Sequence, residues 1–454
     1  MLNVLAKVKA HPRGSTVILI TIVILLLGIT GLKFFDNHLA SPNGNILKIG
    51  EEKDSQEIIS EVIDGHPQEC AKRLGFDNYR TFHSFAIDPQ DSKTLYVAVE
   101  FKGVFKSQDG GTTWRAITKG LRGYPKRQDP GQPCHDQHPN LIVDPSNPKR
   151  LLLTSSTSPG FLTDPSSENG GVYESTDGGD SWHQLFDQDM NAWTYEALVI
   201  DPTDNKTVYV GTNALPASHR EADPNKIYVK KGIIYKTTNG GDSWQELPTG
   251  LVPYLRSGRL FINPENTKEL LFTTMALPAN QGGGQVQSDQ LGIVHSADGG
   301  ESWQSLKSLP KNHGAIREAD VSPQNFKNIF IYASPSNQQE FKYYSQDGGQ
   351  TFSRADTQAN LFRYDPNDKT GLRLLGLSVY AQPRTIFESL DGGKSWHPYS
   401  SLPKEVTNDI RVSNIVWDPQ VKNTVYLNGD EGKIWKSVDG GQTWELILSL
   451  EKLG

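Results

Sequence analysis

Six residues that could bind a polar ligand or partner stand at equivalent positions of a repeated pattern. Each lies four or five residues before the Asp, or its replacement, of a turn that contains Pro. His83, Glu196 and Arg317 are five residues before it, and Asn140, Arg259 and Glu318 are four residues before it. Each alone is commonly a capping or salt-bridging residue. Together they are the hypothesised binding residues, because a ligand pocket is defined by a few convergent polar groups.

Carboxylates in and beside this set raise a second hypothesis, hydrolysis of a glycosidic bond. That reaction needs two carboxyl groups flanking the bond, one of them able to donate a proton. Glu196 with Glu318 or Asp320 is the pair that the sequence offers. The residues alone therefore leave both binding and hydrolysis open.

A short run from Cys134 to His138 contains Cys, His and Asp, residue types that bind metals. One loop cannot supply a closed tetrahedral set of ligands by itself, so we expect neither a metal nor a cofactor. The chain has two cysteines, Cys70 and Cys134. If the domain lies outside the cytoplasm, we expect these two to form a disulfide.

The elements that position these residues follow from one motif, Ser/Thr-x-Asp-Gly-Gly-x-Ser/Thr-aromatic, which occurs seven times. Its third residue is, in chain order, Asp109, Asp177, Asn239, Asp298, Asp347, Asp391 and Asp439. The glycine pair permits the positive φ angles of a tight reversal, and the Asp side chain can accept hydrogen bonds from the turn. Two copies depart from the pattern, with Asn239 for Asp and Phe352 for Trp. Each copy predicts a β-hairpin.

A longer repeat frames each hairpin. An apolar strand that ends in a Pro turn and a second apolar strand precede it, as in Phe85 to Pro89 followed by Thr94 to Ala98. Four antiparallel strands repeated radially make a propeller blade. We therefore predict an all-β, seven-bladed propeller over residues 81–454 that closes without a shared strand. The sixth unit is the weakest, with Tyr364-Asp365-Pro366 as its turn.

Long loops are predicted on one face of this propeller. The turns between the first two strands and the repeated hairpins share a face, so the other connections lie opposite. These connections are long at residues 119–138, 155–170, 211–231 and 274–292. Loops on rigid scaffolds carry function but also tolerate insertion without any role. We expect the binding residues to lie on this variable-loop face.

The N-terminal region predicts a membrane anchor. Residues 1–13 contain three basic residues and residues 14–32 contain no charged residue, a length that spans a bilayer as a helix. We expect a cytoplasmic segment at 1–13, a transmembrane helix at 14–35 and the rest on the extracytoplasmic side. A cleaved signal peptide is the alternative.

A tether is predicted between the anchor and the propeller, over residues 36–80. Residues 51–64 within it have apolar residues at helical spacing and predict a short helix. The net charge of the whole chain is −7, which disfavours a general nucleic-acid binder.

The seven motifs resemble Asp-boxes, the repeat of bacterial neuraminidases. This repeat is found in sialidases, sortilin-type receptors, xyloglucan hydrolases and photosystem II assembly factors. The resemblance implies a propeller that binds a protein or glycan as a scaffold or assembly factor, or alternatively a sialidase-like or β-glucan-cleaving glycoside hydrolase. Tyr79 to Phe82 contains Arg80 but lacks the Arg-Ile-Pro motif of sialidases. The xyloglucan hydrolases use a cleft between two propellers, and this chain is long enough for one.

Overall fold

A computed structural model describes part of the chain. The described residues are 38–40, 46–48, 82–99, 103–121, 135–157, 171–186, 197–212, 234–247, 255–276, 292–306, 308–310, 315–336, 339–378, 385–402, 412–429 and 432–449. Strands β1 (His38–Ala40) and β2 (Ile46–Lys48) form an antiparallel pair of their own, in a unit that covers Met1–Lys53. The predicted transmembrane helix, the helix at 51–64, Cys70 and Cys134 lie outside the described residues. Among the residues that the structure describes, no helix is long and apolar enough to cross a membrane.

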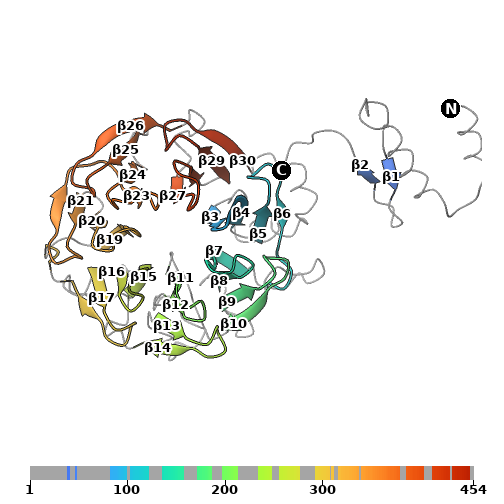
Figure 1. The fold of residues 1–454 in the computed structure, drawn as a ribbon, viewed down its shortest axis with the longest axis horizontal. Helices are drawn as coiled ribbons and strands as arrows, with labels where there is room; N and C mark the ends of the chain where they lie inside the picture. Colours follow the sequence, from blue (N-terminus) through green and yellow to red (C-terminus); the bar gives the residue numbers. More distant parts are fainter. Residues whose placement is uncertain are drawn as a thin grey trace, which may run out of the picture. The chain divides into compact units, whose positions relative to one another are not determined.

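Seven antiparallel sheets of four strands each form a ring, which confirms the predicted propeller (Figure 1). Each sheet is one blade, and its strands follow chain order from the inside of the ring outwards. The blades consist of β3 (Phe82–Asp88), β4 (Asp91–Val99), β5 (Gly103–Ser107) and β6 (Arg115–Ala116); β7 (His135–Val143), β8 (Leu151–Thr157), β9 (Gly171–Ser175) and β10 (His183–Phe186); β11 (Leu198–Ile200), β12 (Val208–Gly211), β13 (Ile234–Thr237) and β14 (Gln245–Leu247); β15 (Leu255–Ile262), β16 (Leu270–Ala276), β17 (Gly292–Ser296) and β18 (Gln304–Ser305); β19 (Ala315–Val321), β20 (Ile329–Ser336), β21 (Gln339–Ser345) and β22 (Ser353–Ala355); β23 (Leu361–Tyr364), β24 (Leu374–Leu377), β25 (Thr385–Ser389) and β26 (His397–Ser401); and β27 (Val412–Trp417), β28 (Val425–Gly429), β29 (Lys433–Ser437) and β30 (Glu445–Ser449).

The hydrophobic core is divided among the blade interfaces. Each of the seven apolar clusters found among the described residues combines side chains from two neighbouring blades. At the junction of the last and first blades, Tyr426 and Leu448 pack with Phe85 and Trp114. The sheets of these two blades share no strand. Ring closure therefore depends on side-chain packing, as the sequence predicted.

The Asp-box geometry explains why the motif repeats. In the second blade, Asp177 Oδ1 accepts hydrogen bonds from Ser175 Oγ (2.8 Å) and the main-chain N of Ser181 (2.9 Å), and Oδ2 accepts one from Ser181 Oγ (2.6 Å). The second glycine, Gly179, has φ = 96°, and a Cβ there would collide with Ile117 of the preceding blade. The turn conformation therefore requires glycine, and a larger residue would also displace the end of the Ile117 side chain.

Hydrogen bonds place the Asp-boxes beside the Pro turns. In the second blade, the main-chain N of Gly178 donates to the main-chain O of Lys149 at 2.7 Å, and the other six blades have the equivalent bond. Boxes and Pro turns therefore share one face, here called the Asp-box face. The connections at the other strand ends lie on the opposite, variable-loop face. Most of the long loops predicted there lie outside the described residues.

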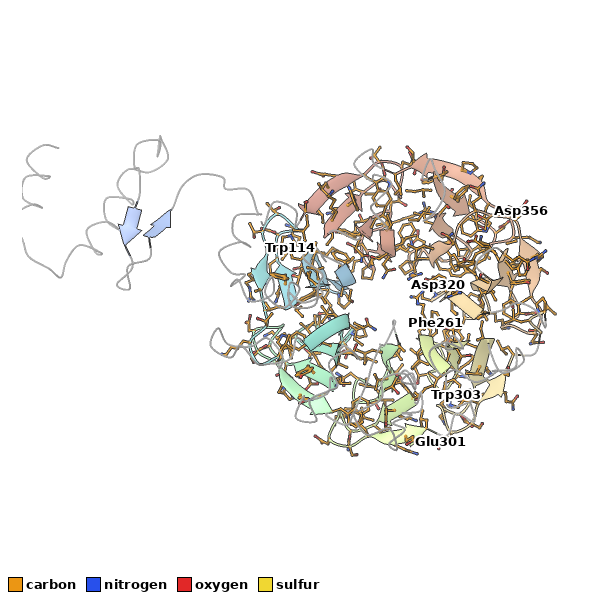
Figure 2. All side chains as sticks on the ribbon, turned by 180° about the vertical axis from the view of Figure 1, so that it is seen from behind. Trp114, Phe261, Glu301, Trp303, Asp320 and Asp356 are labelled. Atoms are coloured by element: carbon orange, nitrogen blue, oxygen red, sulfur yellow. The ribbon has the colours of Figure 1, made fainter. Side chains whose placement is uncertain are left out.

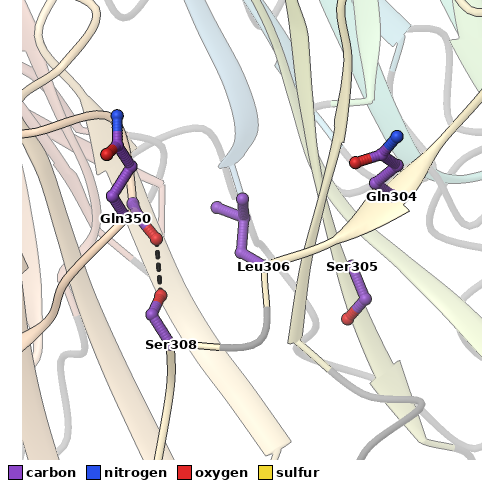
Figure 3. Close-up of a pocket in the computed structure, with 6 residues that line it drawn as sticks. Gln304, Ser305, Leu306, Ser308 and Gln350 are labelled. Atoms are coloured by element: carbon purple, nitrogen blue, oxygen red, sulfur yellow. Dashed lines mark hydrogen bonds between the residues drawn. The ribbon is translucent and has the colours of Figure 1, made fainter.

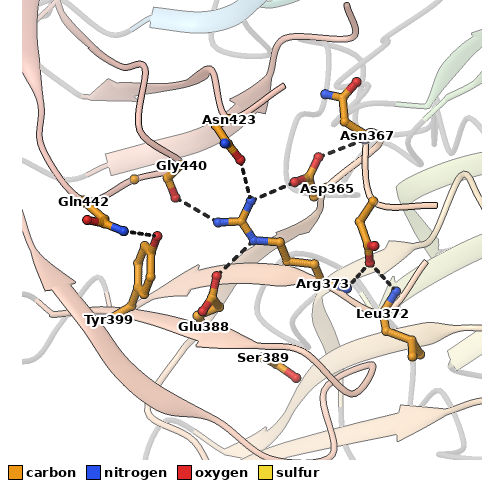
Figure 4. Close-up of polar contacts among 12 residues, drawn as sticks. Asp365, Asn367, Leu372, Arg373, Glu388, Ser389, Tyr399, Asn423, Gly440 and Gln442 are labelled. Atoms are coloured by element: carbon orange, nitrogen blue, oxygen red, sulfur yellow. Dashed lines mark hydrogen bonds and ion pairs between the residues drawn. The ribbon is translucent and has the colours of Figure 1, made fainter. Parts of the chain in front are cut away.

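Cationic side chains connect several blades to the next on the Asp-box face. Arg373 of the sixth blade donates to Glu388 and Asp365 (both 2.9 Å) and to the main-chain O of Gly440 (3.1 Å) in the Asp-box of the seventh blade (Figure 4). In the first blade Lys106 Nζ donates to the main-chain O of Gly178 at 2.9 Å. Such bonds satisfy box carbonyls that would otherwise be buried without a partner.

Candidate ligand site on the inner wall of blades four to six

A β-bulge recurs in the innermost strands where the sequence placed its candidate binding residues. The pairing register shifts at Phe82/Ser84, Gln137/Asn140, Ser257/Leu260, Ile316/Glu318 and Val412/Asn414. The shifts fall five residues before the Pro-turn position, so His83 and Arg317 are the extra residues of their bulges. A bulge redirects the side chain that it inserts and is frequent beside functional sites. In β15 the bulge contains Gly258, where a Cβ would collide with Thr273.

Four charged side chains from three consecutive blades form one cluster on the inner wall of the ring. Arg259 of β15 donates from Nη1 to Asp320 Oδ1 (2.9 Å) and lies 3.4 Å from Glu318 Oε1, both in β19. Arg363 of β23 donates from Nη1 to the same Glu318 oxygen at 2.9 Å. We call Arg259, Glu318, Asp320 and Arg363 the inner-wall cluster. It joins two of the predicted binding residues to the predicted carboxylate Asp320.

Main-chain groups complete the inner-wall cluster. The main-chain N of Tyr364 donates to Asp320 Oδ2 at 2.7 Å, and Arg259 also donates to the main-chain O of Ala319 at 2.8 Å. Burial, together with the charge of Asp320, raises the pKa of the Tyr364 hydroxyl well above its ordinary value. The Arg363 and Asp320 side chains are 8% and 9% exposed, and those of Arg259 and Glu318 are 19% and 18% exposed. The cluster is thus largely removed from water, where removal of one partner leaves a buried charge without compensation and is strongly destabilising.

The inner-wall cluster interrupts an otherwise apolar row. Two residues before the Pro-turn position, the other five innermost strands carry half-buried apolar residues: Ala86, Ile142, Val199, Phe261 and Val416. Asp320 and Arg363 occupy the same position in blades five and six. Figure 2 shows Phe261 and Asp320 beside the central opening. At this position the inner wall is therefore charged in blades five and six and apolar in the other five blades.

A second polar group lies next to this sector and was not predicted from the sequence. The Tyr332 hydroxyl donates to Glu340 Oε1 (2.9 Å), and Lys342 Nζ donates to Glu340 Oε2 (2.7 Å). Tyr332 is the register partner of Glu318. Burial alone would raise the pKa of Glu340, but hydrogen bonds from Lys342, Tyr332 and Asn360 outweigh burial and hold that pKa below its ordinary value. The only signal for this group in the sequence was the pair Tyr332 and Lys342, which lie opposite each other in the hairpin of β20 and β21.

The other predicted binding residues have different environments. Arg317 is exposed, and its side chain forms no hydrogen bond or ion pair with any residue that the structure describes. Asn140 is buried, and its Nδ2 has no partner among the described residues. His83 lies in β3, and its side chain is outside the described part. Glu196 lies outside the described residues, so its predicted pairing with Glu318 or Asp320 is untested.

Chemically, the inner-wall cluster favours recognition over proton transfer. Glu318 Oε1 and Asp320 Oδ1 accept hydrogen bonds from guanidinium groups and are thereby engaged by arginine. Arginine beside carboxylate presents directional donors and acceptors in a fixed plane, which suits polar ligands. No group of three or more His, Cys, Asp or Glu side chains that could hold a metal occurs in the described part of the chain.

A cavity lies elsewhere, between the outer strand of blade four and the Asp-box of blade five (Figure 3). It is lined by Gln304, Ser305, Leu306, Ser308, Gly349 and Gln350. Ser308 Oγ donates to the main-chain O of Gly349 at 2.5 Å, and Leu306 packs against the same glycine. These contacts join two blades, and no charged group points into the cavity from its lining residues. We therefore assign it to blade packing.

Comparison with known proteins supports the repeat and the fold. Residues 343–354 match the family described as BNR/Asp-box repeat. The chain is 21% identical over 381 residues to the oligoxyloglucan-reducing end-specific xyloglucanase of Emericella nidulans, covering 81% of this chain and 39% of that protein. It is 24% identical over 300 residues to a xyloglucanase of Paenibacillus sp, covering 61% of this chain and 24% of that protein. The chain thus spans well under half the length of the curated relatives it matches.

Solved structures are similar in fold at low sequence identity. The GH74 xyloglucanase from Xanthomonas campestris has a TM-score of 0.59 at 13% identity, with 82% of this chain and 55% of that chain covered. YCF48 from Cyanidioschyzon merolae has a TM-score of 0.48 at 12% identity, with 79% of this chain and 95% of that chain covered. At these identities the xyloglucanase likeness shows the fold alone. The chain is therefore an Asp-box β-propeller whose function is inferred from its own site.

Proposed function

We propose that this propeller binds an extended glycan or protein segment on its variable-loop face and acts as a scaffold or assembly factor. The observation that carries this proposal is the inner-wall cluster, which spans three blades. Exposed Arg317 stands in β19 one residue before Glu318 of that cluster. A polymer that crosses the central opening would meet the inner-wall cluster on one side and, at the equivalent position of the other blades, half-buried apolar residues. Few polar groups placed in a mostly apolar wall give orientation and specificity.

A β-glucan is the first ligand to test, because the curated relatives are named for xyloglucan. Full-length protein would be titrated with xyloglucan oligosaccharides in a calorimeter. Arg317→Ala should weaken binding about tenfold, the effect of losing one hydrogen bond from a charged donor, and should leave the melting temperature unchanged. Lys394→Ala, an exposed cation of the sixth Asp-box, is the matched control on the opposite face. Unchanged affinity in Arg317→Ala, or weakened affinity in Lys394→Ala, would contradict the assignment of the face.

Glycoside hydrolysis is the second candidate function. It is favoured by the match to a named xyloglucanase over 81% of the chain. Release of reducing ends from xyloglucan, β-glucans and sialosides would be measured for the parent and for Glu196→Gln. Turnover that is lost in Glu196→Gln, with binding retained, would replace the scaffold proposal by a hydrolase. Binding without turnover supports the scaffold.

The location of the propeller is a further part of this proposal. We propose that residues 14–35 anchor the chain in a membrane and that the propeller lies on the extracytoplasmic side, because residues 14–32 are uncharged and follow a basic segment. A reporter active only outside the cytoplasm would be fused after residue 50. A silent reporter, with an active cytoplasmic reporter at the same point, would refute this topology.

A further inference from the structure

The third Asp-box, residues 237–244, uses the same positions as the others but reverses one hydrogen bond. Asn239 Oδ1 accepts hydrogen bonds from Thr237 Oγ1 (2.8 Å) and the main-chain N of Ser243 (3.0 Å). Asn239 Nδ2 donates to Ser243 Oγ at 2.8 Å. In the second box the corresponding hydroxyl, Ser181 Oγ, is the donor to Asp177 Oδ2. The serine hydroxyl can rotate to serve either role.

The residue after Asn239 is Gly240, and this pair has a known chemical weakness. The main-chain N of the following residue can attack the side-chain carbonyl carbon of asparagine, and glycine leaves that nitrogen unobstructed. A C–N bond forms between the Gly240 nitrogen and the side-chain carbonyl carbon of Asn239, and the bond to the side-chain nitrogen breaks. Ammonia leaves, and a succinimide ring remains in the chain. Water then opens the ring. The chain gains aspartate if the new C–N bond breaks, or isoaspartate if the original main-chain bond breaks.

The fold restrains both reacting groups. The main-chain N–H of Gly240 donates to the main-chain O of Lys206 at 2.9 Å, in the adjacent Pro turn. Two donors fix the side-chain carbonyl of Asn239, and Gly240 is held at φ = 80°. Attack requires the Gly240 nitrogen to leave Lys206 and turn towards the Asn239 side chain. The reaction therefore requires the box to open.

We propose that Asn239 is a deamidation site whose rate is set by opening of the third Asp-box, and whose aspartate product restores the hydrogen bonding of the other six boxes. Each conversion consumes one water and releases one ammonia, with no other reactant. Aspartate places a second acceptor oxygen where Nδ2 stood, and the Ser243 hydroxyl turns to donate to it. Isoaspartate routes the main chain through Cβ and Cγ, so its carboxylate can no longer lie between Thr237 and Ser243.

The second box shows how the aspartate product would behave. Burial opposes ionisation of Asp177, but the combined hydrogen bonds from Ser181 and Ser175 outweigh it and lower the pKa of that carboxyl to about 2. An aspartate at position 239 would therefore be charged at neutral pH and would accept charge-assisted bonds, which are stronger than those of an amide. We expect Asn239→Asp to be at least as stable as the parent protein.

The test follows deamidation at individual asparagines by peptide mass spectrometry. Full-length protein is incubated at alkaline pH, folded and in concentrated urea. Conversion of Asn239 should be at least about tenfold slower in the folded protein, because hydrogen bonds of the box must break before the Gly240 nitrogen can attack. Thr237→Val removes the hydroxyl that contacts both Asn239 and Gly241, and should accelerate conversion only in the folded protein. The buried Asn428-Gly429 pair in β28 is the internal control and should convert only in urea.

Three results would overturn the proposal. Equal conversion rates for Asn239 in folded and unfolded protein would show that the box does not control the reaction. Absence of conversion in urea would show that the site is inert. A lower melting temperature for Asn239→Asp than for the parent would contradict the restored box. Because folded and unfolded parent protein are compared directly, the test does not depend on the folding of Thr237→Val.

Discussion

Removing one box carboxylate should destabilise the propeller by a calculable amount. In the sixth blade, Asp391 accepts hydrogen bonds from Ser389 Oγ (2.9 Å), the main-chain N of Ser395 (2.8 Å) and Ser395 Oγ (2.5 Å). A buried hydrogen bond to a charged group contributes about 1.5–3 kcal/mol. Asp391 is only half-buried, and water can replace part of each bond in the variant. We therefore expect Asp391→Ala to lower the free energy of unfolding by about 1–3 kcal/mol in total.

The matched control is Asp391→Asn, because the third box folds with Asn239 at this position. The amide keeps Oδ1 as an acceptor for two of the three bonds, so the loss should stay below about 1 kcal/mol. Urea denaturation of both variants, followed by tryptophan fluorescence, measures the difference as a shift in midpoint at unchanged slope. Equal stability of the Ala variant and the parent would refute the reasoning. An Asn variant as unstable as the Ala variant would show that charge, and not acceptor geometry, holds the turn.

Three further predictions follow from the same contacts. Gly179→Ala should destabilise more than Asp391→Ala in urea, because it combines a strained φ with a collision against Ile117. Arg259→Ala should lower the free energy of unfolding by about 3 kcal/mol, since two largely buried carboxylates lose a partner, whereas Arg317→Ala should not. The pKa of Asp177 is about 2 when folded and about 3.9 when unfolded. Its stabilisation should therefore be complete above about pH 4 and lost as pH falls towards 2, which an acid titration of parent and Asp177→Asn would measure.

The contrast between Arg259 and Arg317 could not be read from the sequence. Both were predicted as binding residues on the variable-loop face. The structure pairs Arg259 with Asp320 and Glu318, 61 and 59 residues further along the chain, while Arg317 is the extra residue of a bulge. Whether an arginine on an innermost strand is paired or exposed depends on the pairing register of its strand and on which blades are neighbours. Neither property can be read from the residues next to Arg259 or Arg317.

The sixth blade illustrates the reverse case. Its turn at Tyr364-Asp365-Pro366 was predicted, although the strand before it was poor in the pattern. The structure shows β23 (Leu361–Tyr364) with all four residues buried. Arg363 is the reason for the poor pattern, because it stands where other blades have an apolar residue. A charged residue two positions before the Pro turn, in blades five and six alone, was the signal that could have located the inner-wall cluster.

The sequence by itself determined the blades and their number. Each blade is specified locally, by a glycine pair that permits a tight turn, an acceptor that fixes it and apolar strands around it, so seven repeats predict seven blades. The sequence supplied Arg259, Glu318 and Asp320 as candidates, and only the tertiary structure decided that they meet with Arg363 in one site. The inner-wall cluster joins three blades through contacts made only when the ring is assembled, and buried charges remain stable only where such partners meet.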